Sequence, residues 1–117
     1  MEDIIAYTTS LMEEIERCHD RFVTGEKPNK KREFFLQVKK ETEPVFATLD
    51  RWVETSEKLV KQRKITVLHP QQIDATKENM ESLVLHSYYK DTRKRRFMEI
   101  YKSCYYIFAQ LLKEISP

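Results

Sequence analysis

The chain has 117 residues, of which 40% are apolar and 34% charged, and its 21 Lys and Arg nearly balance 19 Asp and Glu. This length predicts a single domain with one modest core, and the composition excludes a disordered chain. Gly25 is the only glycine, which excludes glycine-rich phosphate-binding loops and disfavours folds built from many tight turns. A formal net charge of +2 does not identify a partner.

The first predicted helix covers residues 2–23. Apolar side chains recur there at the spacing that places them on one face of an α-helix. The main members of this face are Ile4, Leu11, Ile15, Cys18 and Phe22. The stretch containing Gly25 and Pro28 ends the helix, because both residue types interrupt helical structure.

The second predicted helical region covers residues 30–63, with an apolar face that runs from Phe35 to Leu59. Pro44 lies inside it. Proline lacks the amide hydrogen that a helix needs, and its ring clashes with the preceding turn. We therefore expect a kink or break at residues 41–44. An unbroken helix of this size would be about 50 Å long and would overshoot the first helix, which also favours a break.

The third and fourth predicted helices cover residues 70–88 and 92–115. Before them, residues 64–68 form the one β-like run, which we interpret as an extended linker because it is short and has no partner strand. Proline is favoured at the first position of a helix, so Pro70 marks the start of the third. Four amphipathic helices with short connections predict an all-α, single-domain, antiparallel up-down-up-down four-helix bundle.

The expected compartment is the cytoplasm. The sequence begins with Met1, Glu2 and Asp3, whereas a signal peptide begins with positive charge and an apolar stretch. No run approaches the roughly 18 apolar residues of a membrane span. Both cysteines, Cys18 and Cys104, fall within apolar helical patterns and are interpreted as small buried side chains.

Several short stretches occur in a recognisable order along nearly the whole chain. They are Phe34-Phe35 with Val38-Lys39, Pro44-Val45, Trp52, Val67-Leu68-His69-Pro70-Gln71-Gln72-Ile73, Ser87-Tyr88-Tyr89 and Arg95-Arg96-Phe97. Together they resemble the YppE-like family of small uncharacterised bacterial proteins. The resemblance implies a cytosolic four-helix bundle from a Gram-positive bacterium. Because that family has no established activity, it supplies no catalytic residues.

A metal site in the bundle core is one alternative. Di-iron bundles need two Glu-x-x-His motifs on different helices, and only Glu16 with His19 has this spacing. His86 would lie at the same end of the bundle as His19, so Glu16, His19 and His86 could form a set of two histidines and one carboxylate. Half-buried packing of both histidines is the preferred interpretation. We predict no catalytic residue and no cofactor.

Cations gather at one end of the predicted bundle. They are Lys27, Lys30, Lys31 and Arg32 around the start of the second helix, and Lys90, Arg93, Lys94, Arg95 and Arg96 around the start of the fourth, with Arg21 nearby. Cations in the first turn of a helix oppose its macrodipole at a small cost. Their presence at two helix starts therefore indicates a docking end for an anion, although solvated surface charge would also explain them.

Aromatic residues gather around the third and fourth helices: Tyr88, Tyr89, Tyr101, Tyr105, Tyr106, Phe97 and Phe108. Packing in and around the core is the common use of such side chains, and a binding groove is the alternative. Tyr88 and Tyr89 would flank the cations as apolar contacts.

These features predict a non-enzymatic interaction module that binds an anionic or protein partner through the cation-rich end. Self-association into a homodimer through an apolar face is a further alternative. Sequence-specific DNA recognition is not expected, because no base-reading motif accompanies the cations.

Overall fold

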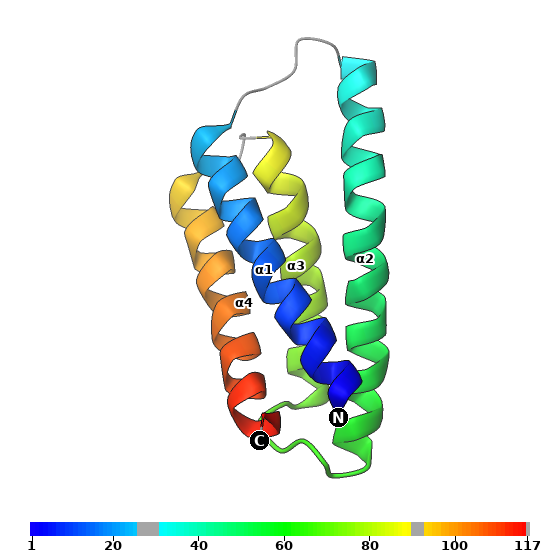
Figure 1. The fold of residues 1–117 in the computed structure, drawn as a ribbon. Coiled ribbons are helices and arrows are strands. Elements are labelled where there is room, and N and C mark those ends of the chain that lie inside the picture. Colours follow the sequence, from blue (N-terminus) through cyan, green and yellow to red (C-terminus); the bar gives the residue numbers. More distant parts are fainter. Residues whose placement is uncertain (26–30, 90–92, 117) are drawn as a thin grey trace.

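The computed structural model describes residues 1–25, 31–89 and 93–116. These residues form four helices and no strand: α1 (Glu2–Thr24), α2 (Lys31–Lys61), α3 (Pro70–Tyr89) and α4 (Lys94–Ile115). Successive helices run in opposite directions, with both termini at the lower end in Figure 1. The predicted all-α up-down-up-down bundle is confirmed. No helix in the described ranges combines the length and the apolar character that crossing a bilayer requires.

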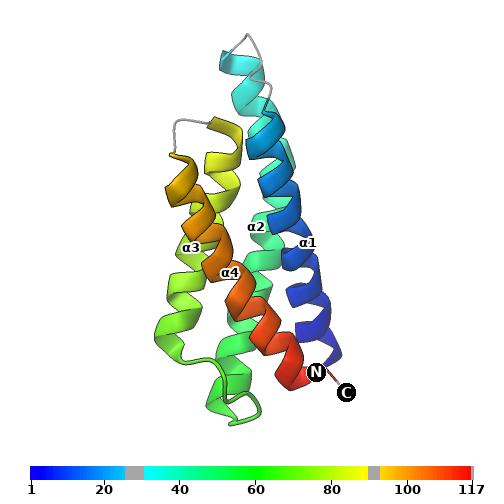
Figure 2. The same ribbon diagram turned by 90° about the vertical axis from the view of Figure 1, so that its left-hand side faces the viewer.

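The four helices do not form a square. α1 packs against all three other helices and α3 does the same, whereas α2 and α4 do not approach each other closely within the described residues. α1 and α3 therefore lie on the short diagonal of the cross-section, with α2 and α4 on either side (Figures 1 and 2). The molecule measures 49 × 27 × 24 Å.

Trp52 of α2 lies at the centre of the core and is fully buried. Its indole N–H donates a hydrogen bond of 3.1 Å to the hydroxyl of Thr8 on α1. Its ring meets Phe108 of α4 edge to face, with centroids 5.4 Å apart. The Trp52 side chain therefore connects α2 to α4, the two helices that do not pack closely against each other. Edge-to-face contact is a favoured geometry for an aromatic pair.

We expected a kink or a break at residues 41–44, and the break is a wrong prediction. α2 continues without interruption from Lys31 to Lys61, with Pro44 inside it. Pro44 is exposed, so water can solvate the backbone carbonyl that lacks a partner amide. Buried side chains on both sides of the proline lie on one face of the helix: Val38, Thr42, Leu49 and Trp52. Their burial holds the two halves in one helix.

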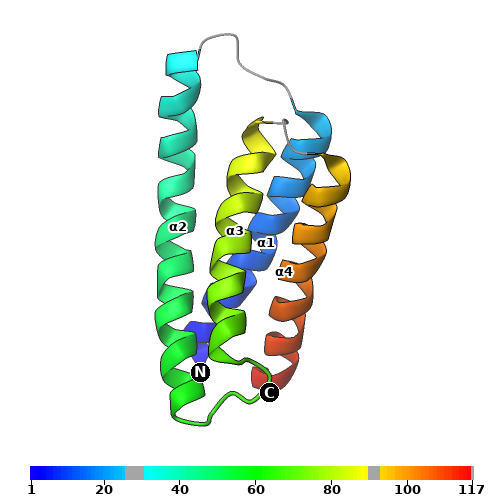
Figure 3. The same cartoon turned by 180° about the vertical axis from the view of Figure 1, so that it is seen from behind.

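The overshoot that favoured a break is also present in the structure. The N-terminal turns of α2 project beyond the other helices (Figures 1 and 3). Phe35, which the sequence pattern places on the buried face, is 58% exposed for this reason, and Leu36 is exposed beside it. Phe34 is partly buried and packs against the edge of the core, and Val38 is the first residue of α2 whose side chain is buried within the core.

The segment between α2 and α3 is a linker, as predicted. Ile65 and Leu68 insert into the core from it. The amide and the hydroxyl of Thr66 both donate hydrogen bonds to the carboxylate of Glu114 on α4, at 2.7 and 2.5 Å. The linker is thereby attached to the end of α4 as well as to the core.

Candidate docking surfaces

The ends of α1 and α3 and the starts of α2 and α4 meet at one end of the bundle (Figure 1). Four consecutive exposed cations, Arg93 to Arg96, mark the start of α4 there, and we call these four residues the basic end. Lys31 and Arg32 begin α2 at the same end. Lys27, Lys30 and Lys90 lie outside the described residues.

The basic end is weakly neutralised by the described residues. Arg95 and Arg96 approach the carboxylate of Glu99 at 3.4 and 3.9 Å. The Arg95 side chain is 93% exposed, so solvent screens this pair and it stabilises little. The first turn of α4 contains no acidic residue, and Arg93 at the N-cap makes no side-chain capping bond. The amides of the first turn and the cations therefore favour an anion at the same place.

Arg21 is engaged within the bundle and is not part of this open surface. Its Nη1 donates a 2.7 Å hydrogen bond to the hydroxyl of Ser87. Its guanidinium carbon lies 4.0 Å from the centroid of the Tyr88 ring, the geometry of a cation–π interaction. Arg21 thus fastens the last turn of α1 to the last turn of α3.

The two tyrosines expected to flank the cations are also packed. Tyr88 is 8% exposed, and its hydroxyl donates a 2.5 Å hydrogen bond to Glu41 of α2. Burial, reinforced by this bond, raises the pKa of Tyr88. Tyr89 is half-buried and meets Phe34 edge to face, with centroids 5.3 Å apart. Both rings connect α3 to α2.

A hollow of about 400 Å³ lies beside this polar cluster. It is lined by Glu14, Arg17, Arg21, Phe34, Gln37, Glu41 and Tyr88. The buried carboxylate of Glu14 accepts a 2.8 Å hydrogen bond from Arg17 and a contact of 3.8 Å from the thiol of Cys18. Burial and the negative charge of Glu14 raise the pKa of Cys18 to about 12. Burial likewise raises the pKa of Cys104 to about 12. A thiol held protonated is a poor nucleophile.

The structure does not bring the candidate metal ligands together. Glu16 accepts a hydrogen bond from the hydroxyl of Tyr101, and the imidazole of His19 lies 5.4 Å from the Tyr101 ring. His86 is partly buried, and its Nδ1 has no hydrogen-bond partner among the described residues. Over the ranges 1–25, 31–89 and 93–116, no three His, Cys, Asp or Glu side chains are placed to hold a metal ion.

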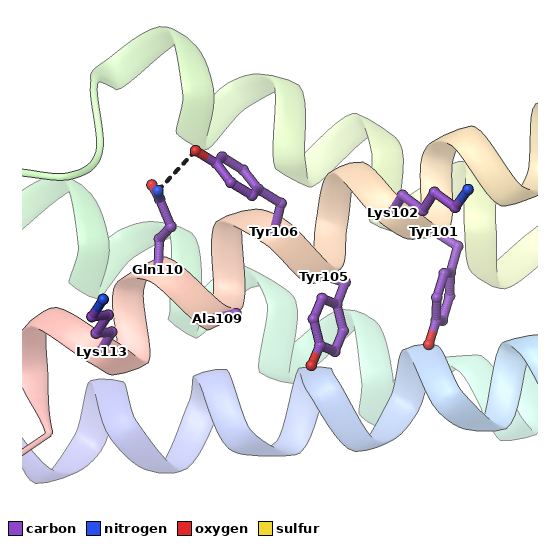
Figure 4. Close-up of a pocket in the computed structure, with 7 residues that line it drawn as sticks. All are labelled: Tyr101, Lys102, Tyr105, Tyr106, Ala109, Gln110 and Lys113. Atoms are coloured by element: carbon purple, nitrogen blue, oxygen red, sulfur yellow. Dashed lines mark hydrogen bonds between the residues drawn. The ribbon is translucent and has the colours of Figure 1, made fainter.

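A second surface lies on the outward face of α4. There, a shallow hollow of about 490 Å³ is lined by Tyr101, Lys102, Tyr105, Tyr106, Ala109, Gln110 and Lys113. Tyr101 and Tyr105 point toward α1, whereas Tyr106 points toward α3 and accepts a 2.8 Å hydrogen bond from Gln110 (Figure 4). We call this surface the α4 groove.

The aromatic cluster seen in the sequence therefore divides into two groups. Phe97 and Phe108 are core residues, whereas Tyr105 and Tyr106 are 47% and 60% exposed. The sequence interpretation missed Lys102 and Lys113 as members of a surface. Their separation of eleven residues, about three helical turns, was a signal that could have placed them on one face with the exposed tyrosines.

The fold and these surfaces define a class: a small all-α bundle that carries two exposed surface features and, in its described part, no set of metal ligands. Comparison with known proteins gives the family. Residues 8–115 match the family described as a bacterial domain of unknown function, DUF1798. The chain belongs to this family.

Relatives agree with this assignment. The uncharacterized protein YppE of Bacillus subtilis (strain 168) is 31% identical over 115 residues, covering 98% of this chain and 94% of YppE. The crystal structure of YppE superposes with a TM-score of 0.86 over the same shares of the two chains. The solution structure of YppE gives 0.84 and covers 99% and 94%. The resemblance to the YppE-like family is confirmed.

A Listeria innocua protein of unknown function shares the fold alone. Its crystal structure gives a TM-score of 0.84 at 16% identity, over 96% of this chain and 90% of that one. The bundle is thus retained where most side chains differ.

Proposed function

We propose that this protein is a non-enzymatic interaction module that docks an acidic protein surface through its basic end. The observation that carries the proposal is the start of α4, where four consecutive exposed cations occur without an acidic residue in the first turn. Each cation opposes the helix macrodipole by about 0.3–1 kcal/mol. The same charges, together with the positive end of the helix dipole, attract an anionic partner.

An acidic protein fits this surface better than a nucleic acid does. The net charge of the chain is only +2, and the four cations are confined to one end instead of following a stripe that could track a phosphate backbone. The described part of the chain contains no helix-turn-helix or comparable base-reading element. We place the module in the cytoplasm as part of the same proposal.

The buried thiols argue against a cysteine nucleophile, which agrees with the non-enzymatic role proposed. Cys18 and Cys104 are buried and held in the protonated form, so neither offers a reactive thiolate.

The test is capture of partners from bacterial lysate on the immobilised protein at about 0.05 M and about 0.5 M salt. The variant combines Arg93→Glu, Lys94→Glu and Arg95→Glu. We expect the wild-type protein to retain an acidic partner at low salt and to lose it at high salt, because salt screens exposed charges. The variant should retain none at either salt concentration. A partner that binds the variant as well as the wild type would contradict the proposal.

A matched control carries the same change of charge at the opposite end of the bundle: Lys58→Glu, Lys61→Glu and Lys64→Glu, all at exposed positions. It should bind like the wild type. The variant at the basic end should melt no earlier than the wild type, because glutamates in a first turn favour the helix. Loss of binding then cannot be attributed to unfolding. If nuclease treatment removed the captured material, the partner would be a nucleic acid and not an acidic protein. That result would overturn the proposal.

A further inference from the structure

The midline of the α4 groove is a row of three residues, Lys102, Ala109 and Lys113. Eleven residues correspond to about three helical turns, or roughly 16 Å, so the two lysines lie on the same side of α4 at either end of the groove. Ala109 lies between them and has a small side chain. Because the Ala109 side chain is small, the backbone of another helix could approach α4 closely at this point.

Two tyrosines border this midline on opposite sides (Figure 4). Tyr105 and Tyr106 are 47% and 60% exposed, so core packing does not account for them. Tyrosine offers a large rigid apolar surface at a small entropic cost, and it is enriched at the energetic centres of protein interfaces. Tyr105 and Tyr106 therefore offer two exposed aromatic surfaces on either side of Ala109.

The charge of the groove selects the occupant. Both lysines are exposed, and the sequence contains no Asp or Glu between Glu99 and Glu114. The residues that line the groove include no Asp or Glu, and the carboxylate of Glu16 that accepts from Tyr101 belongs to α1. An occupant with one acidic residue near each end of the groove would therefore complement the two lysines.

A second copy of this chain does not meet that requirement. In an antiparallel pairing of two α4 grooves, Lys102 of one copy would face Lys113 of the other. In a parallel pairing, each lysine would face its own equivalent. Both arrangements oppose like charges, which weakens association.

We propose that the α4 groove docks an amphipathic helix of another protein, with an acidic residue at each end of a short apolar stripe and the two acids about eleven positions apart. This inference goes beyond the proposed function, because none of its residues belongs to the basic end. Docking of a helix in an apolar groove is a recurrent mode of recognition, in which the anchors recur at helical spacing.

The probe is a displayed library of amphipathic helices of about 18 residues. An apolar stripe is fixed, and the residues that flank it at the two positions eleven apart are randomised. Selection against the wild-type protein should enrich Asp or Glu at both flanking positions. Selection against a Lys102→Glu, Lys113→Glu variant should enrich Lys or Arg at the same positions. Such a reversal arises only if the randomised residues meet these two side chains.

The best acidic peptide is then synthesised and titrated. Tyr106→Ser and the double lysine variant should each weaken its binding at least tenfold, which corresponds to about 1.4 kcal/mol. A control with Lys39→Glu and Lys58→Glu, two exposed lysines of α2, should bind within about twofold of the wild type, a difference well under 1 kcal/mol. Circular dichroism establishes that every variant is folded.

Three results would overturn the inference: no enrichment of acidic flanks, binding that is insensitive to Tyr106→Ser, or a wild-type homodimer in light scattering that Tyr106→Ser dissociates. The last would make a second copy the occupant. The variant at the basic end, with Arg93, Lys94 and Arg95 replaced by Glu, should still bind the peptide. The two proposals can therefore fail independently.

Discussion

Trp52 makes one hydrogen bond from the middle of the core, and its acceptor is a single hydroxyl. The Thr8 hydroxyl accepts from the indole and donates its own hydrogen bond of 2.6 Å to the carbonyl of Ile4. We expect Thr8→Val to cost about 1–3 kcal/mol of unfolding free energy, because it leaves a buried indole N–H without a partner. Urea unfolding followed by the fluorescence of this single tryptophan measures the change.

The matched control is Thr8→Ser, which keeps the hydroxyl and removes one methyl group. It should lose about 1 kcal/mol or less, in line with one buried methyl. If valine were as stable as threonine, the hydrogen bond would not contribute to the stability of the core.

The bond from Tyr88 to Glu41 gives the fold a dependence on acid pH. It is the main cause that lowers the pKa of Glu41 below 4.5, its ordinary value. A carboxylate with a lowered folded pKa stabilises the fold above its unfolded pKa, and that stability is lost as pH falls through the folded pKa. Tyr88→Phe should therefore cost about 1 kcal/mol at pH 7, and its difference from the wild type should shrink below about pH 4.

Urea unfolding over the acid range measures this difference. Glu41→Gln serves as the control, because it keeps an acceptor but cannot titrate. A difference between wild type and Tyr88→Phe that stayed constant from pH 7 to about pH 3 would show that the charge of Glu41 plays no part.

At the scale of the helices, Pro44 tests how far packing overrides local preference. Proline inside a helix costs about 3 kcal/mol relative to alanine, and part of this is recovered because proline also restricts the unfolded chain. We expect Pro44→Ala to stabilise the protein by about 1–3 kcal/mol, since the site is exposed and the helix is already continuous. Thermal unfolding measures the increase in Tm.

Glu43→Ala is the matched control, at an exposed neighbouring position, and should change stability by no more than about 0.5 kcal/mol. A Pro44→Ala protein that is less stable than the wild type would mean that the proline shapes α2 in a way the core requires.

The helices could be predicted from the sequence because their evidence is local. The face containing Ile4, Leu11 and Ile15 repeats within a few turns, and so does that of α4. The continuity of α2 could not be predicted, because it depends on what packs against Val38 and Trp52 from other helices. A local rule about proline is overridden there by burial.

At the scale of the whole molecule, topology decided which parts of the candidate surfaces could be predicted. Arg93 to Arg96 lie at the expected end, because an antiparallel bundle brings alternate helix ends together. The packing of Tyr88 could not be predicted. Its partners are Arg21 and Glu41, which are 67 and 47 residues away along the chain, and nothing near Tyr88 indicates them.

The two cysteines provide a measurement of how the whole bundle opens. Cys18 and Cys104 are buried on α1 and α4, and burial raises the pKa of each thiol to about 12 from its ordinary value of 9.0. A thiol reagent should therefore label the folded protein at least about a thousandfold more slowly than the unfolded chain, because reaction requires an opening that costs about 5 kcal/mol or more. Mass spectrometry of the alkylated protein at pH 8 follows the reaction.

The single-cysteine variants Cys18→Ala and Cys104→Ala should be labelled at similar rates, since the two thiols share one core. If Cys104 reacted rapidly while Cys18 stayed protected, α4 would separate from the bundle alone, and the α4 groove would lie on a helix that detaches instead of on a rigid face.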